Sequence, residues 1–151
     1  NCSGSVARFI AEAVEKQGLL DQFPNVDGVV PIVHGTGCGM SGKDEGYETL
    51  FRTLQGYAHN PNFGAILLIG LGCEVMQIPD IVGRGQMRPD GNFKYMTIQQ
   101  TGGTRRSSER GGDLLVVMAA KVNETARAPA PGIELMIGLH GVHPDRSSIP
   151  T

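Results

Sequence analysis

The sequence predicts an α/β domain of the three-layer, Rossmann-like or flavodoxin-like kind, with a mostly parallel sheet and glycine-rich turns at the strand ends. Segments with apolar residues at helical spacing alternate with short apolar runs, which are typical of buried parallel strands. Glycine-rich turns directly follow two of these runs, at residues 35–39 and 70–73. A chain of 151 residues corresponds to about one domain.

The first part of the chain predicts a helix, a strand and a second helix. Residues 3–17 carry apolar side chains at helical spacing, and Gly18 follows as a helix stop. Residues 26–34 predict a strand. Because Pro31 within it lacks an amide hydrogen, we place this strand at a sheet edge or at a bulge. Residues 45–58 predict a helix with His59 as a carboxyl-terminal capping group.

The second part of the chain repeats the alternation of strands, turns and helices. Residues 64–71 are apolar throughout, as in a strand covered on both faces. The predicted elements that follow are a short helix within 73–82, a strand at 95–100, a helix at about 105–126 and a last strand at 133–139. Because the elements alternate, we expect parallel strands joined by right-handed crossovers.

Composition narrows the class of function. The formal net charge of −2 provides no basic surface for a nucleic acid. We expect no membrane segment, because no apolar run reaches the roughly 18 residues that a span needs. Three cysteines cannot all pair within one chain, and their wide spacing is unlike that of a secreted disulfide framework. We therefore expect a reducing, cytoplasmic setting.

The cysteines mark the predicted site. Cys38 and Cys73 lie in glycine-rich turns after apolar runs, and Cys2 lies in a comparable polar turn. Open α/β sheets bind ligands beyond the carboxyl ends of their strands, so these turns favour a site at one sheet edge. Thiolates bind zinc, iron and iron–sulfur clusters. Catalytic thiols are an alternative, as are cysteines that act only as small buried side chains.

Two further residues are candidates for acid–base catalysis. His34 ends the predicted strand at 26–34, where it would be a general base or a metal ligand. The alternative for His34 is a ring that bonds only to the backbone. Glu74 follows Cys73 and is a second candidate base or ligand, or else a charge at a helix amino terminus.

The turn before the last predicted helix is suited to an anion. Gly102, Gly103, Thr104 and Arg105 combine backbone N–H groups at a helix start with an adjacent arginine, a pattern that binds carboxylates. A plain tight turn with a solvated arginine is the alternative. No Walker-type lysine is present in this turn, so a carboxylate substrate is favoured over a nucleotide.

Six motifs, taken together and in order, resemble the altronate/galactarate dehydratase family. They are Asn1-Cys2-Ser3-Gly4-Ser5-Val6-Ala7-Arg8, His34-Gly35-Thr36-Gly37-Cys38-Gly39-Met40, Arg52-Thr53-Leu54-Gln55-Gly56-Tyr57, Asn60-Pro61-Asn62-Phe63, Gly70-Leu71-Gly72-Cys73-Glu74 and Thr101-Gly102-Gly103-Thr104-Arg105. The resemblance extends over residues 1–139, which we expect to form the dehydratase-family α/β domain. Residues 140–151 are expected to be a divergent or truncated tail, because His140-Gly141-Val142 stands where the family continues with Cys-Gly-Gly-Ser-Asp.

The resemblance implies a hydro-lyase that dehydrates a sugar acid to a 2-keto-3-deoxy acid with the help of iron. The iron would be Fe²⁺ or an iron–sulfur cluster held by Cys2, Cys38 and Cys73. His34 and Glu74 would be catalytic, and the substrate would contact Gly37 and the turn at 102–105. Expected partners are the sugar acid and the remaining domains of a longer enzyme, in a homo-oligomer.

Two other functions are compatible with the same residues. A related lyase on this scaffold would eliminate sulfite from a small sulfo-acid. A non-catalytic structural or subunit-interaction domain of a larger dehydratase would leave the chemistry to other segments.

Overall fold

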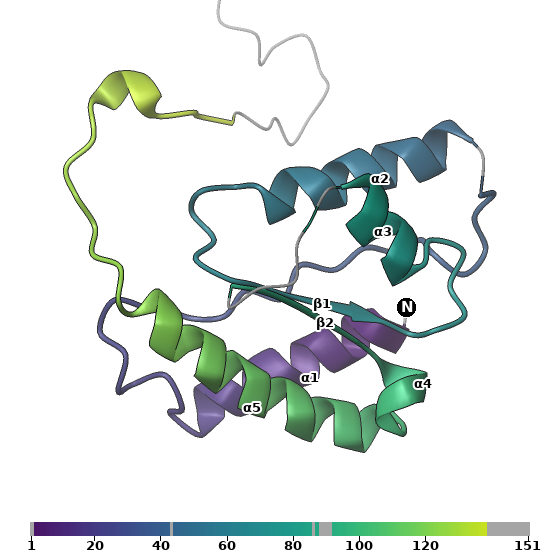
Figure 1. The fold of residues 1–151 in the computed structure, drawn as a ribbon, viewed down its shortest axis with the longest axis horizontal. Coiled ribbons are helices and arrows are strands. Elements are labelled where there is room, and N and C mark those ends of the chain that lie inside the picture. Colours follow the sequence, from purple (N-terminus) through teal and green to yellow (C-terminus); the bar gives the residue numbers. More distant parts are fainter. Residues whose placement is uncertain (1, 43, 86, 88–91, 139–151) are drawn as a thin grey trace, which may run out of the picture.

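Helices surround a pair of parallel strands (Figure 1). The computed structural model describes residues 2–42, 44–85, 87 and 92–138. Its elements are α1 (Cys2–Lys16), α2 (Glu45–Ala58), β1 (Ile66–Gly70), α3 (Ile78–Arg84), β2 (Phe93–Thr97), α4 (Ile98–Thr101), α5 (Thr104–Val122) and the 3-10 turn η1 (Gly132–Glu134). β1 and β2 are parallel, with Ile66 opposite Phe93 and Gly70 opposite Thr97. The prediction of an α/β chain with parallel strands is confirmed.

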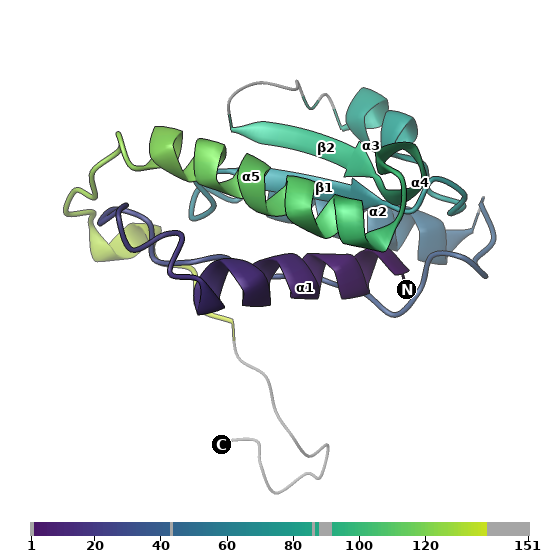
Figure 2. The ribbon, with the colours of Figure 1, turned by 90° about the horizontal axis from the view of Figure 1, so that it is seen from below.

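The helices lie on both faces of the two strands. α2 and α3 lie on one face, and α1 and α5 lie on the other (Figures 1 and 2). None of the helices in the described part of the chain is long and apolar enough to cross a membrane.

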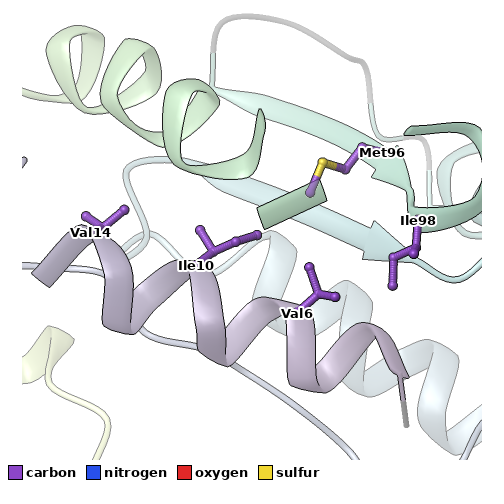
Figure 3. Close-up of a cluster of buried hydrophobic side chains, with 5 residues drawn as sticks. All are labelled: Val6, Ile10, Val14, Met96 and Ile98. Carbon is purple, nitrogen blue, oxygen red and sulfur yellow. The ribbon is translucent and has the colours of Figure 1, made fainter. Parts of the chain in front are cut away.

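The first core cluster lies between α1 and β2. Val6, Ile10 and Val14 repeat every four residues along α1 and are almost completely buried. Their side chains face Met96 of β2 and Ile98 of α4 (Figure 3). Burying each such side chain contributes about 1.5–3 kcal/mol, so the apolar stripe of α1 holds this helix against the strands.

The second core cluster fixes α2 and α3 on the opposite face. Tyr47 and Phe51 of α2 are buried with Met76, Ile81 and Met87. The Arg84 guanidinium lies 4.2 Å from the centre of the Phe51 ring and donates to both oxygens of Glu48, at 2.8 and 3.0 Å. These hydrogen bonds lower the pKa of Glu48 and raise that of Arg84 from their ordinary values.

The predicted long helices are confirmed with small shifts at their ends. α1 is followed by Gly18, whose φ of +59° is favourable only for glycine, as expected of a stop. α2 begins at the cap residue Asp44, whose side chain accepts from the Tyr47 N–H at 2.9 Å. His59 is its carboxyl-terminal cap, as predicted. α5 covers 104–122 where the sequence predicted 105–126.

Two predicted strands are wrong. Residues 26–34 are irregular, with Val30 69 % exposed, and no backbone hydrogen bond joins them to β1 among the described residues. Pro31 cannot donate to a neighbouring strand, and a cavity separates the segment from β1. The predicted strand at 133–139 is replaced by η1 and an extended, exposed stretch, because no strand lies beside it in the described region; residue 139 lies outside that region. The tail at 140–151 also lies outside it.

The remaining differences concern where elements end. The strand predicted at 95–100 is β2 at Phe93–Thr97, and α4 takes over at Ile98. The short helix predicted within 73–82 is α3 at Ile78–Arg84, which begins with Pro79 in its first turn. The sheet of the described residues contains only β1 and β2, so the wider Rossmann-like or flavodoxin-like sheet is not confirmed.

Candidate functional site

The turns after β1 and β2 lie side by side at the carboxyl ends of the strands. The Leu71 carbonyl accepts from the N–H of Gln99 at 3.1 Å, which joins the two turns directly. Gly72 has a φ of +115°, and a Cβ there would lie 2.6 Å from Oε1 of Gln99. Only glycine therefore fits at this point, and the two turns form one surface at the edge where parallel sheets bind ligands.

Glu74 closes the turn that follows β1. Its two carboxylate oxygens accept from the backbone N–H groups of Leu71, at 2.8 Å, and Gly72, at 2.5 Å. Its backbone carbonyl accepts from the Gln77 side chain. A carboxylate has about four acceptor positions, so two remain for another donor. Glu74 thus shapes the turn and also lines the large cavity described next.

A cavity of about 970 Å³ connects several of the predicted site residues. It lies between residues 25–34, the helices and β1, and its lining includes His34, Gly37, Cys38, Gly70 and Glu74. The half-buried His34 ring lies 3.3 Å from the Thr36 hydroxyl through Nδ1. One histidine, one cysteine and one glutamate therefore contribute to the walls of the same cavity.

The three cysteines do not meet at one point. All three are free and exposed. Cys2 and Cys38 border a smaller hollow formed with residues 35–40, whereas Cys73 lines neither this hollow nor the large cavity. Among the described residues, no group of three or more His, Cys, Asp or Glu side chains is placed to hold a metal ion. Two thiols at one hollow are suitable donors for iron, but as placed they do not complete a ligand set, and iron binding stays a prediction.

The start of α5 presents unused backbone donors. Gly102 and Gly103 have φ angles of +94° and +100°, and Gly103 caps α5 without a side-chain hydrogen bond. The first helical bond of α5 runs from the Ser107 N–H to the Gly103 carbonyl. The N–H groups of residues 104–106 therefore point away from the helix, and the helix dipole adds positive potential there.

The arginine predicted at this turn is exposed. Arg105 pairs through Nε with Glu109 at 3.0 Å, one helical turn later, and its side chain is 92 % exposed. An exposed pair of this kind stabilises little, so Arg105 is free to exchange Glu109 for a carboxylate ligand. Arg106 follows Arg105 in the same turn, and its guanidinium lies about 3.1 Å from the position of a Cβ on Gly102.

Gln99 is the residue that the sequence did not identify. Its N–H and its side chain both lie against the turn after β1, through Leu71 and Gly72. The sequence placed Gln99 in a predicted strand. The only signal of its role was that it is a polar residue just beyond an apolar run.

Comparison with known proteins agrees with the motifs. The family described as D-galactarate dehydratase/Altronate hydrolase, second domain, matches residues 1–123. An altronate dehydratase of Bacillus subtilis (strain 168) is 27 % identical over 137 residues, which cover 91 % of this chain and 26 % of that protein. An altronate dehydratase of Escherichia coli (strain K12) is 35 % identical over 77 residues, which cover 51 % of this chain and 15 % of the relative. The matched region thus spans about a quarter or less of these relatives, and no solved structure matches the chain.

Proposed function

Since the chain belongs to the D-galactarate dehydratase/altronate hydrolase family, we propose that it is the part of a hydro-lyase that binds and dehydrates a sugar acid. The observation that carries the proposal is the cavity that His34, Cys38 and Glu74 all line, with Glu74 in the turn just beyond the carboxyl end of β1. Both relatives are named for altronate dehydration, and the family name adds galactarate. The product of such a reaction would be a 2-keto-3-deoxy acid.

The start of α5, which does not line the large cavity, is proposed to bind the substrate carboxylate. The free N–H groups of residues 104–106 and the Arg105 side chain supply donors for it, and Gly102 and Gly103 allow close approach. Gly37 is a further proposed contact, because it lines the cavity and lies between His34 and Cys38. The same donors would stabilise the negative charge that develops on the carboxylate when the neighbouring carbon loses its proton.

His34 is the proposed base. Its imidazole would take the proton from the carbon next to the carboxylate, and the β-hydroxyl would leave with one proton as water. The resulting enol would then tautomerise to the keto acid. Glu74 is the second candidate, although its two backbone hydrogen bonds favour a role in holding the turn.

Iron is a separate proposal. A ferrous ion or an iron–sulfur cluster would polarise the substrate oxygens when bound. Cys2 and Cys38 would be its donors at the hollow they share, with Cys73 as the third. Because the described side chains do not complete a ligand set, no step above depends on the metal.

The test of the histidine compares two matched substitutions in the full-length enzyme. His34→Ala should lower turnover of the sugar acid by on the order of 10²-fold or more, the usual contribution of a general base. His59→Ala is the control, because the His59 ring bonds to the Gln55 carbonyl at the end of α2 and should leave turnover unchanged. Equal turnover in the two variants would remove His34 from the role.

A non-catalytic role is the second candidate. It is favoured by the absence of a three-ligand group among the described residues and by the small share of each relative that the chain covers. In that case the chain would support an active site formed elsewhere. The His34→Ala variant would then keep full turnover.

A further inference from the structure

The large cavity lies where one more strand of the sheet would fit. Helices line it on both faces, with α1 and α5 on one side and α2 on the other. In the layer between the helices, β1 forms one wall and residues 25–34 form the opposite wall. A strand of five residues is about 17 Å long and lies about 4.8 Å from its neighbours, so a space of about 970 Å³ is large enough for one.

The wall formed by β1 has unpaired backbone groups. The Ile66 N–H bonds to the Asn92 carbonyl at 2.7 Å, so Ile66 and every second residue after it face β2. Leu67 and Ile69 consequently direct their N–H and C=O groups to the other edge. Among the described residues, no backbone hydrogen bond reaches β1 from that edge. An open edge of this kind is a template for another strand.

Residues 25–27, at the start of the opposite wall, are bonded to residues just after α5 and, within the described part of the chain, not to β1. The N–H and side-chain amide of Asn25 bond to the side chain and carbonyl of Asn123, at 2.9 and 2.8 Å. Asp27 pairs with Arg127. These contacts anchor residues 25–27 to the end of α5, while the apolar residues that follow line the cavity, namely Val29, Val30, Ile32 and Val33.

The burial of β1 also indicates a missing neighbour. All four residues from Ile66 to Ile69 are apolar, yet each is only half-buried although helices lie on both faces of the strand. Strands with this composition are normally covered on both faces and paired on both edges. Filling the cavity with apolar side chains would complete their burial.

Chain direction is compatible with a strand that leads into α1. The connection from β1 to β2 passes through α3, and residues 26–34 connect to β1 through α2 on the same face. α1 lies on the opposite face of the strands from α2 and α3. A right-handed crossover through α1 must therefore move across the sheet in the opposite direction, from the β1 side toward residues 26–34. Such a crossover would begin at a strand between β1 and residues 26–34 and would end at residues 26–34. The first residue of α1, Cys2, lies beside residues 35–40, which follow that segment.

We propose that the space between β1 and residues 26–34 is a slot for one apolar strand, parallel to β1, on the polypeptide that leads into α1 in a longer form of the protein. The relatives contain ample further chain, because the matched region covers 26 % and 15 % of them. The exposed apolar stretch at 133–137 is the competing occupant, because a right-handed crossover from β2 through α5, on the same face as α1, leads to the same space. We favour the strand before α1 because residues 133–137 lie outside the matched family region at 1–123.

Hydrogen exchange at single amides tests the slot. In the 151-residue chain, the amides of Leu67 and Ile69 should exchange on the order of 10²-fold faster than that of Leu68, which faces β2 on the same strand. In the full-length natural polypeptide, all three should exchange at similar rates. Fast exchange of Leu67 and Ile69 in the longer protein would overturn the proposal.

Two variants of the full-length protein identify the occupant. In the first, Leu135→Asp with Ile137→Asp should leave the protection of Leu67 and Ile69 intact. Loss of protection would assign the slot to residues 133–137 and refute the proposal.

The second variant tests whether residues 26–34 simply close onto β1. It combines Val29→Cys with Ile69→Cys, two positions that pack against the same core cluster. A disulfide needs Cα atoms within about 7 Å, whereas an intervening strand separates its neighbours by about 10 Å. We expect no bond between these two cysteines, and its formation would show direct pairing and overturn the proposal.

Discussion

We expect the adjacent glycines Gly111 and Gly112 in α5 to give opposite changes in stability when each is replaced by alanine. Gly111 faces α1, and a Cβ there would lie 2.3 Å from Cδ1 and 3.0 Å from Cγ1 of Ile10, and 3.2 Å from Cε of Met96. Gly112 points outward, with no heavy atom within 4 Å of an added Cβ. Alanine is favoured over glycine inside a helix by about 1 kcal/mol. Gly112→Ala should therefore raise the free energy of unfolding by about that amount.

Gly111→Ala gains the same helix propensity but overfills the contact between α1 and α5. Ile10 belongs to the buried cluster with Met96 and Ile98, so moving its side chain to make room for the added methyl group disturbs that packing. Overpacking of a buried contact costs about 1–3 kcal/mol. The two variants should therefore differ by about 2 kcal/mol in the free energy of unfolding, with Gly111→Ala the less stable.

Urea denaturation followed by far-UV circular dichroism measures this difference, and thermal unfolding provides a second reading. For a chain of this size, about 1 kcal/mol corresponds to about 2–4 °C in Tm, so a separation of about 4–8 °C is expected. Equal stabilisation by the two alanines would refute the close packing of α1 against α5.

Two further predictions concern an ion pair and a thiol. Because a hydrogen bond from Arg84 lowers the pKa of Glu48, the pair stabilises the fold above the ordinary value of 4.5, and this contribution disappears as the pH falls through the lowered pKa. Thermal unfolding at pH 7 and pH 3 should thus show a smaller loss of Tm in Glu48→Gln than in the unchanged chain, and equal losses would contradict the pairing. For the proposed metal site, Cys38→Ser in the full-length protein purified without oxygen should lower the iron content well below that of the unchanged protein, whereas full retention of iron would exclude Cys38 as a ligand.

The long helices were predictable because their signals are local. Val6, Ile10 and Val14 repeat at helical spacing within α1, and Asp44 and His59 mark the two ends of α2. Such features depend only on residues within a few helical turns of one another in the sequence.

The outer strands were not predictable, because a strand needs a partner that its own sequence does not specify. Residues 26–34 have the composition of a strand, but Pro31 cannot donate, and the structure places a cavity where a neighbour would lie. α4 was missed because four residues carry too little periodicity to be recognised.

The position of two candidate site residues in the turn after β1 was predictable, but their contacts were not. Glycine-rich turns after apolar runs correctly placed Cys73 and Glu74 beyond β1. The sequence could not show that both oxygens of Glu74 bond to backbone N–H groups, or that Cys73 lies apart from the hollow shared by Cys2 and Cys38. Those features depend on χ angles and on the relative position of two loops.

The most direct test of the proposed function is product formation by the full-length protein. Altronate and galactarate would each be incubated with the purified enzyme, and the products would be analysed by mass spectrometry and by a colorimetric assay for 2-keto-3-deoxy acids. Loss of one water from either acid, with formation of the keto acid, is the expected result. If the protein is folded and loaded with iron and yet dehydrates neither acid, the proposed function is contradicted.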